Sequence, residues 1–118
     1  MRAAINRENF VLPASIDFIA AFGCDVNFDR QTHTEEYVFE DELSDISRMW
    51  IGSVDRTFSL SMTKNGTEVV RVFDECVSCV RLDETRKVVV ITLGDGAFTQ
   101  ELTLSVWPRG RVSFTRMR

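Results

Sequence analysis

Several residue types that carry catalysis, disulfide bonding or membrane insertion are scarce in this sequence. Its 118 residues include one histidine, three cysteines and two prolines. No apolar run approaches the ~20 residues that a membrane-spanning helix needs. The lone histidine, His33, is not accompanied by a nucleophile-elbow sequence. These absences argue against a disulfide-stapled secreted protein, a membrane-spanning protein and a histidine-dependent hydrolase.

The remaining composition predicts one cytoplasmic domain. Residues 1–8 are charged and contain no apolar signal core, and three cysteines without a secretion signal favour reduced thiols. Apolar residues make up 44% and charged residues 27% of the chain, as in ordinary globular proteins. A chain of this length buries about two thirds of its unfolded surface, enough for a single core over residues 1–118.

The cysteines and carboxylates do not form a convincing reactive site. Cys76 and Cys79 have a CxxC spacing, but they lie in an apparent strand, where side chains three positions apart point to opposite faces. Only Cys24 and His33 remain to complete a zinc site, and a redox pair needs a helix N-terminus. The paired carboxylates lack a pocket signature. We therefore expect no enzyme, no metal and no cofactor.

Positive charge is missing from a long segment. No lysine or arginine occurs from Gln31 to Ser47, where six carboxylates gather: Glu35, Glu36, Glu40, Asp41, Glu42 and Asp45. The chain closes on basic residues with no acid among them: Arg109, Arg111, Arg116 and Arg118. A net charge of -4 argues against nucleic-acid binding. Two interpretations stay open: a solvated face with an arginine-protected edge strand, or an acidic patch that docks a basic partner.

One helix is expected near the N-terminus. Pro13 or Ser15 opens it, and Gly23 ends it as a left-handed cap. Phe18 and Phe22 widen its apolar face, so we expect it to lie on a sheet.

The rest of the chain alternates as strand after strand. Connections of two to four residues leave no room for crossover helices. Thr34 to Glu40 is assigned as strand although its acids resemble a helix start, and Val26 and Phe28 are compatible with a brief strand. The confident strands are Ile46 to Ser53, Thr57 to Thr63, Thr67 to Phe73, Cys76 to Leu82, Lys87 to Leu93, Phe98 to Trp107 and Arg111 to Arg116.

This pattern predicts a mainly β, α+β domain: a curved antiparallel meander of about six to seven strands with one N-terminal helix packed on it. Lys87 to Leu93 is apolar on both faces and needs two covers. The helix supplies one, and sheet curvature, a partner chain or a dimer mate supplies the other.

Two loops set the expected register, Lys64-Asn65-Gly66 and Pro108-Arg109-Gly110. Both are treated as three-residue hairpin loops in which glycine takes a left-handed conformation beside a bulge. They then predict four cross-strand pairs: Leu60 with Val70, Phe58 with Val72, Val106 with Val112, and Leu104 with Phe114.

The segment Phe39-Glu40-Asp41-Glu42-Leu43-Ser44-Asp45-Ile46, followed by short strands, resembles small bacterial immunity proteins of polymorphic and contact-dependent growth inhibition toxin systems. The resemblance spans Phe39 to Phe114 and includes an F-x-D-x-L-x-x-I run and a strand-turn segment from Val72 to Val77. Such families often have histidine where this chain has Glu40. The resemblance implies a non-enzymatic inhibitor, or antitoxin, that binds a cognate bacterial toxin domain, often a basic nuclease.

We therefore hypothesise an immunity or inhibitor protein that acts by protein–protein interaction with a toxin domain. Its carboxylates would steer the partner, with Tyr37 or Trp107 as an anchor. The expected partner-binding residues are Glu35, Glu36, Tyr37, Glu40, Asp41, Glu42, Asp45 and Trp107. Two alternatives are a small-molecule-binding domain with His33 and Cys24 at the mouth of a helix–sheet cavity, and a homodimer that pairs edge strands.

Overall fold

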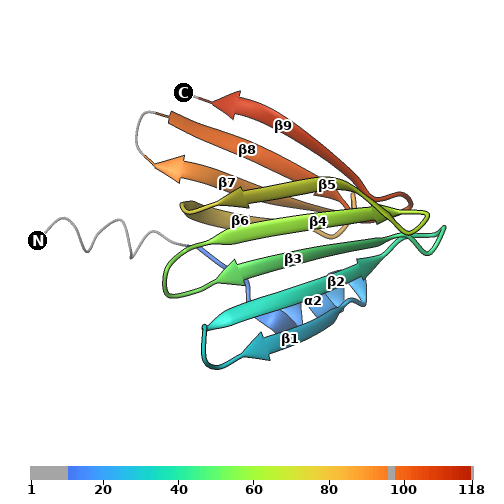
Figure 1. Ribbon diagram of the computed structural model, residues 1–118, viewed down its shortest axis with the longest axis horizontal. Helices are drawn as coiled ribbons and strands as arrows, with labels where there is room; N and C mark the ends of the chain where they lie inside the picture. The colour runs from blue at the N-terminus through green and yellow to red at the C-terminus, as the bar shows by residue number, and fades with distance from the viewer. Residues whose placement is uncertain (1–10, 96–97, 118) are drawn as a thin grey trace, which may run out of the picture.

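The computed structural model describes residues 11–95 and 98–117, so the charged segment at residues 1–8 and Arg118 lie outside it. Within this part of the chain, one helix precedes nine strands (Figure 1). The helix is too short to span a membrane. In chain order the elements are α2 (Ser15–Phe22), β1 (Asp25–Asp29), β2 (Thr34–Glu40), β3 (Ile46–Gly52), β4 (Phe58–Lys64), β5 (Thr67–Asp74), β6 (Val77–Asp83), β7 (Val88–Asp95), β8 (Phe98–Ser105) and β9 (Arg111–Met117).

The strands form two antiparallel sheets in which sequence neighbours are also spatial neighbours. One sheet has the order β1-β2-β3-β4-β5 and the other β6-β7-β8-β9. The expected mainly β meander with one helix is confirmed. The structure extends it to nine strands, because both segments before Ile46 also pair, and folds it into two layers.

The chain changes sheets between β5 and β6. The Asp74 carboxylate accepts a hydrogen bond from the Cys76 amide at 2.8 Å, which turns the chain sharply. The Val77 amide then donates to the Arg56 carbonyl, and Arg56 Nε donates to the Val77 carbonyl, each at 2.9 Å. These bonds tie the start of β6 to the β3–β4 turn instead of to β5.

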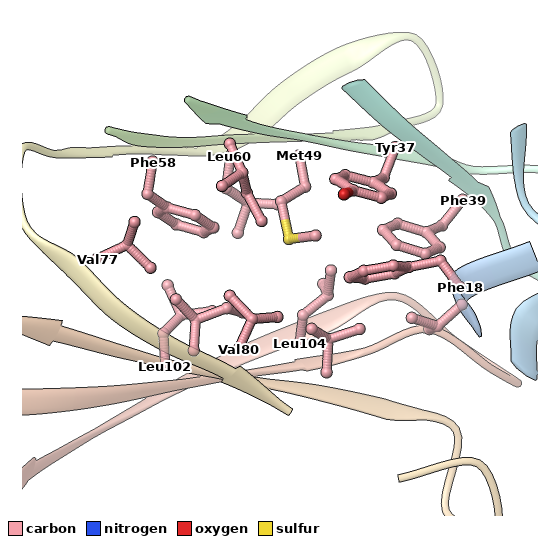
Figure 2. Close-up of a cluster of buried hydrophobic side chains, with 14 of the residues drawn as sticks. Phe18, Tyr37, Phe39, Met49, Phe58, Leu60, Val77, Val80, Leu102 and Leu104 are labelled. Carbon is pink, nitrogen blue, oxygen red and sulfur yellow. The ribbon is translucent and has the colours of Figure 1, made fainter. Parts of the chain in front are cut away.

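Side chains from both sheets meet in one core (Figure 2). Strand alternation buries Val89, Ile91 and Leu93 of β7 against the five-stranded sheet. The cover on this face of the doubly apolar strand is therefore the other sheet. On the opposite face Val90 is half-buried and lines an outer hollow, so the expectation of two covers is not met among the described residues. The core side chains labelled in Figure 2 are Phe18, Tyr37, Phe39, Met49, Phe58, Leu60, Val77, Val80, Leu102 and Leu104.

Helix α2 packs against this core as expected. Phe18 is fully buried, with its ring centroid 4.1 Å from that of Tyr37 in β2. Lys87 Nζ donates to the Ala21 carbonyl at 2.7 Å, which joins the helix to the β6–β7 turn. Gly23 ends the helix with φ 64°, the left-handed conformation predicted from the sequence.

The register predicted around Lys64-Asn65-Gly66 is wrong. Lys64 pairs with Thr67, so Asn65 and Gly66 form a two-residue turn in which both residues have positive φ. That geometry matches the twist of the flanking strands. A register shift between Met62 and Thr63 then places Leu60 opposite Val72. The shift of two residues keeps the predicted inward faces.

The register predicted around Pro108-Arg109-Gly110 is also wrong by two residues. Leu104 pairs with Val112 and Leu102 with Phe114, which leaves residues 106–110 as the loop. The reason lies in bonds made by both ends of this loop. The Val106 amide donates to the Lys87 carbonyl, and the Gly110 amide donates to the Asp41 carboxylate, so neither continues the β8–β9 ladder.

Candidate functional site

Three connections meet at one end of the two sheets, at the right of Figure 1. We call this region the loop end and define it as residues 40–46, 64–66 and 106–110. The Glu42 amide donates to the Pro108 carbonyl at 2.9 Å, and the Asn65 amide donates to Asp45 Oδ1 at 3.1 Å. Lys64 Nζ donates to the Gly110 carbonyl at 2.8 Å. The loop end is therefore held together across both sheets.

Asp41 organises the loop end from inside. Its Oδ1 accepts the amides of Leu43 at 2.9 Å and Asp45 at 3.0 Å, and its Oδ2 accepts the Gly110 amide at 2.9 Å. Lys64 Nζ lies 3.5 Å from Oδ2. Asp41 is 5% exposed, and its contact with the Gly110 amide is buried, while those with the Leu43 and Asp45 amides are part-buried. The carboxylate serves the fold and is not available to a partner.

The pKa of Asp41 follows from these contacts. Burial by itself would raise it, but the amides of Gly110, Asp45 and Leu43 and the charge of Lys64 act in the opposite direction and hold the pKa below its ordinary value. The carboxylate is thus ionised at neutral pH. Lys64 and Gly110, which complete this arrangement, were not among the expected site residues.

Glu40, Glu42 and Trp107 are the expected site residues that the loop end presents to solvent. Both glutamates are exposed, and Trp107 is 48% exposed. Neither glutamate side chain forms a hydrogen bond or ion pair with another described residue. Their charges are therefore uncompensated by the fold. Together with the indole they form a surface that suits a partner with basic and apolar groups.

A hollow of about 420 Å³ lies beside this surface. Cys24 is buried there, and burial raises the pKa of its thiol to about 11, so the thiol is protonated and a poor nucleophile at neutral pH. The hollow brings Glu40, Asp41 and Trp107 together, although they come from β2, the β2–β3 loop and the β8–β9 loop. The lining residues are Phe22, Gly23, Cys24, Asp25, Val38, Phe39, Glu40, Asp41, Ile46, Val106 and Trp107.

The other expected residues are not part of this exposed surface. Tyr37 is fully buried and its hydroxyl donates to the Glu35 carboxylate, while burial raises the pKa of the phenol. Glu36 accepts from Asn27 Nδ2 at 3.1 Å on the outer face of the five-stranded sheet. Asp45 is half-buried and bonded to the Asn65 amide. The acidic segment is therefore not one patch, and its exposed part at the loop end is Glu40 with Glu42.

The small-molecule alternative expects a cavity between helix and sheet. Phe18 and Tyr37 fill that space along α2, and the hollow that Cys24 lines opens where the helix ends. Cys24 precedes β1 and His33 follows it, so they lie at opposite ends of that strand. The three cysteines are free thiols. Across residues 11–95 and 98–117, no group of three or more histidine, cysteine or acidic side chains could hold a metal ion.

The dimer alternative requires an edge strand that is free to pair with a second copy of the chain. β5 and β9 each pair on one side among the described strands, and Phe73 of β5 is 61% exposed. β6 differs, because Val11 bridges it in parallel at Cys79. Pairing of these edges between two copies stays a prediction.

Neither a protein-family model nor the sequence of a curated protein matches the chain. A similar fold occurs in a solved structure, a contact-dependent growth inhibition toxin–immunity protein complex from Klebsiella pneumoniae 342. The alignment has a TM-score of 0.78 at 12% identity and covers 92% of this chain and 98% of that chain. The resemblance expected from the sequence is thereby confirmed at the level of the fold.

Proposed function

We propose that this chain is an immunity-type inhibitor that binds and neutralises a cognate toxin domain through the loop end. The observation that carries the proposal is the half-exposed Trp107 beside the unpaired carboxylates of Glu40 and Glu42. The fold shared with a chain of a toxin–immunity complex supports it. The protein would act without chemistry of its own, in the cytoplasm, by covering the active site or substrate surface of the toxin.

The internal bonds of the loop end favour tight binding. Binding costs free energy when loops must be ordered in the complex, and a surface that is already ordered avoids that cost. Asp41 and Lys64 hold the β2–β3 and β8–β9 connections in place before any partner arrives. Glu40, Glu42 and Trp107 are thus presented in a fixed arrangement.

Reversing the charge of Glu40 and Glu42 should slow association with a basic toxin domain. At low ionic strength we expect E40K/E42K to lower the association rate constant about tenfold, because exposed charges mainly steer encounter. The effect should shrink in high salt, where screening weakens exposed charges. The proposal expects the neighbouring gene to encode the toxin domain, and stopped-flow association with that domain in inactivated form, at low and high salt, measures both.

Glu75 provides the matched control. It is exposed in the β5–β6 connection, at the opposite end of the sheets from the loop end. E75K makes the same charge change as each single variant and should leave the association rate within about twofold of the original. Equal slowing by E75K and E42K would show that net charge, and not the loop end, steers the partner.

A further inference from the structure

Trp107 separates two hollows of different charge. On one side lies the hollow that contains Glu40 and Asp41. On the other side lies a hollow of about 590 Å³ on the four-stranded sheet, where Trp107 and Pro108 form one wall. We call it the arginine hollow. Its lining residues are Arg86, Val88, Thr103, Ser105, Trp107, Pro108, Arg111, Val112 and Ser113.

Arg86 and Arg111 have no acidic partner among the described residues, although both side chains are exposed. Two arginines elsewhere in the sheets have acidic partners. Arg81 Nη2 lies 2.9 Å from Glu101 Oε2, and Arg71 Nη2 lies 2.7 Å from Glu68 Oε2. The arginine hollow therefore holds two guanidinium groups whose charge the fold leaves free.

The chemistry of the lining suits carboxylates. A guanidinium group binds a carboxylate through two parallel hydrogen bonds, and hydroxyls can complete the remaining acceptor sites. Thr103, Ser105 and Ser113 supply hydroxyls on the same strands. Trp107 adds a large apolar surface at the edge of the hollow. Tryptophan and arginine are both enriched in binding hot spots.

We propose that the arginine hollow receives carboxylate side chains of the toxin domain, so that the partner straddles Trp107. This inference rests on the proposed function. It adds that the docking surface of the toxin domain carries acidic groups as well as basic ones. The partner places basic groups toward Glu40 and Glu42, an apolar group on Trp107, and acidic groups toward Arg86 and Arg111. If the partner were rotated by 180° about Trp107, its acidic groups would face the glutamates and its basic groups would face the arginines. This repulsion favours one orientation of the partner.

A nucleic acid is a poorer occupant of this hollow than an acidic protein segment. A phosphate backbone carries negative charge along its whole length. It would run from the arginines toward Glu40 and Glu42 on the far side of Trp107. A protein surface can instead alternate its charges to match.

The first test is the affinity of charge-reversed variants for the inactivated toxin domain of the neighbouring gene. R86E and R111E should each raise the dissociation constant about tenfold, and the double variant should raise it about a hundredfold. Arg30 is the control, because it is exposed in the β1–β2 turn at the other end of β2. R30E makes the same charge change and should leave the affinity within about twofold.

The second test needs no toxin. The protein has two tryptophans, Trp50 and Trp107, so its nuclear magnetic resonance spectrum contains two indole N–H signals. A blocked tetraglutamate peptide should shift the Trp107 signal and leave that of Trp50 in place. R86E/R111E should abolish the shift. A shift of equal size with inorganic phosphate or an oligothymidylate would overturn the assignment to carboxylates.

The outcomes separate the two proposals. If the toxin domain binds and R86E/R111E binds as tightly as the original chain, the arginine hollow is not a contact site and the inhibitor function stands. If the toxin domain binds neither the original chain nor any variant, the proposed function fails. The peptide titration then decides alone whether the hollow takes carboxylates, and an unshifted Trp107 signal contradicts it.

Discussion

Replacing Asp41 with alanine will lower the free energy of unfolding by about 3 kcal/mol, because it leaves the buried Gly110 amide, two part-buried amides and the Lys64 ammonium without their shared acceptor. Urea unfolding at neutral pH measures this loss. Glu42 is the control, since it is an exposed neighbour in the same acidic segment. E42A should change stability by less than about 0.5 kcal/mol. Equal effects of D41A and E42A would contradict the structural role of Asp41.

Asp41 also predicts how stability depends on pH. Its pKa is lower in the folded protein than in the unfolded chain, where an aspartate titrates at about 3.9. The stabilisation is therefore fully present above the unfolded pKa and is lost as the pH falls through the folded pKa. D41N removes the titrating group, so its stability should fall less than that of the original chain between neutral and acid pH. An identical acid dependence would assign this loss to other carboxylates.

Truncation of Phe18 to alanine will cost about 4 kcal/mol, because its fully buried ring joins the helix to the core between the sheets. The cavity would open beside Tyr37, which has little freedom to move into it. Ile16 of the same helix is 66% exposed and serves as the control. I16A should lose less than about 0.5 kcal/mol in urea unfolding. A loss below about 1 kcal/mol for F18A would show that the helix is not part of the core.

Much of the fold could be predicted from alternation of apolar residues. The expected strand from Ile46 to Ser53 differs from β3 by one residue, and Gly23 ends the helix as predicted. The register of the β4–β5 hairpin could not be predicted, because the irregularity between Met62 and Thr63 shifts the strand pairing by one residue and leaves no mark in the apolar pattern. The division into two sheets was also missed. Alternation identifies the buried face of a strand but not which sheet the strand joins.

For the site, the sequence identified exposed residues but not contacts between distant segments. The sequence singled out Glu40, Glu42 and Trp107, which the structure places at one end of the sheets. It could not distinguish Asp41 from its acidic neighbours, since the amide that marks its buried role belongs to Gly110, 69 positions away. Tyr37 carried a usable signal, because it shares a strand face with Phe39, and both are buried.

The central claim is that a toxin domain docks on Trp107, and a calorimetric titration tests it most directly. The inactivated toxin domain of the neighbouring gene is titrated into the original chain, W107A and W50A. Trp50 is the control, because it lies half-buried on the outer face of the five-stranded sheet, away from the loop end. We predict one toxin domain per chain, about thirtyfold weaker binding by W107A and less than threefold weaker binding by W50A. Absence of binding, or a W107A variant that binds as tightly as the original chain, would contradict the account.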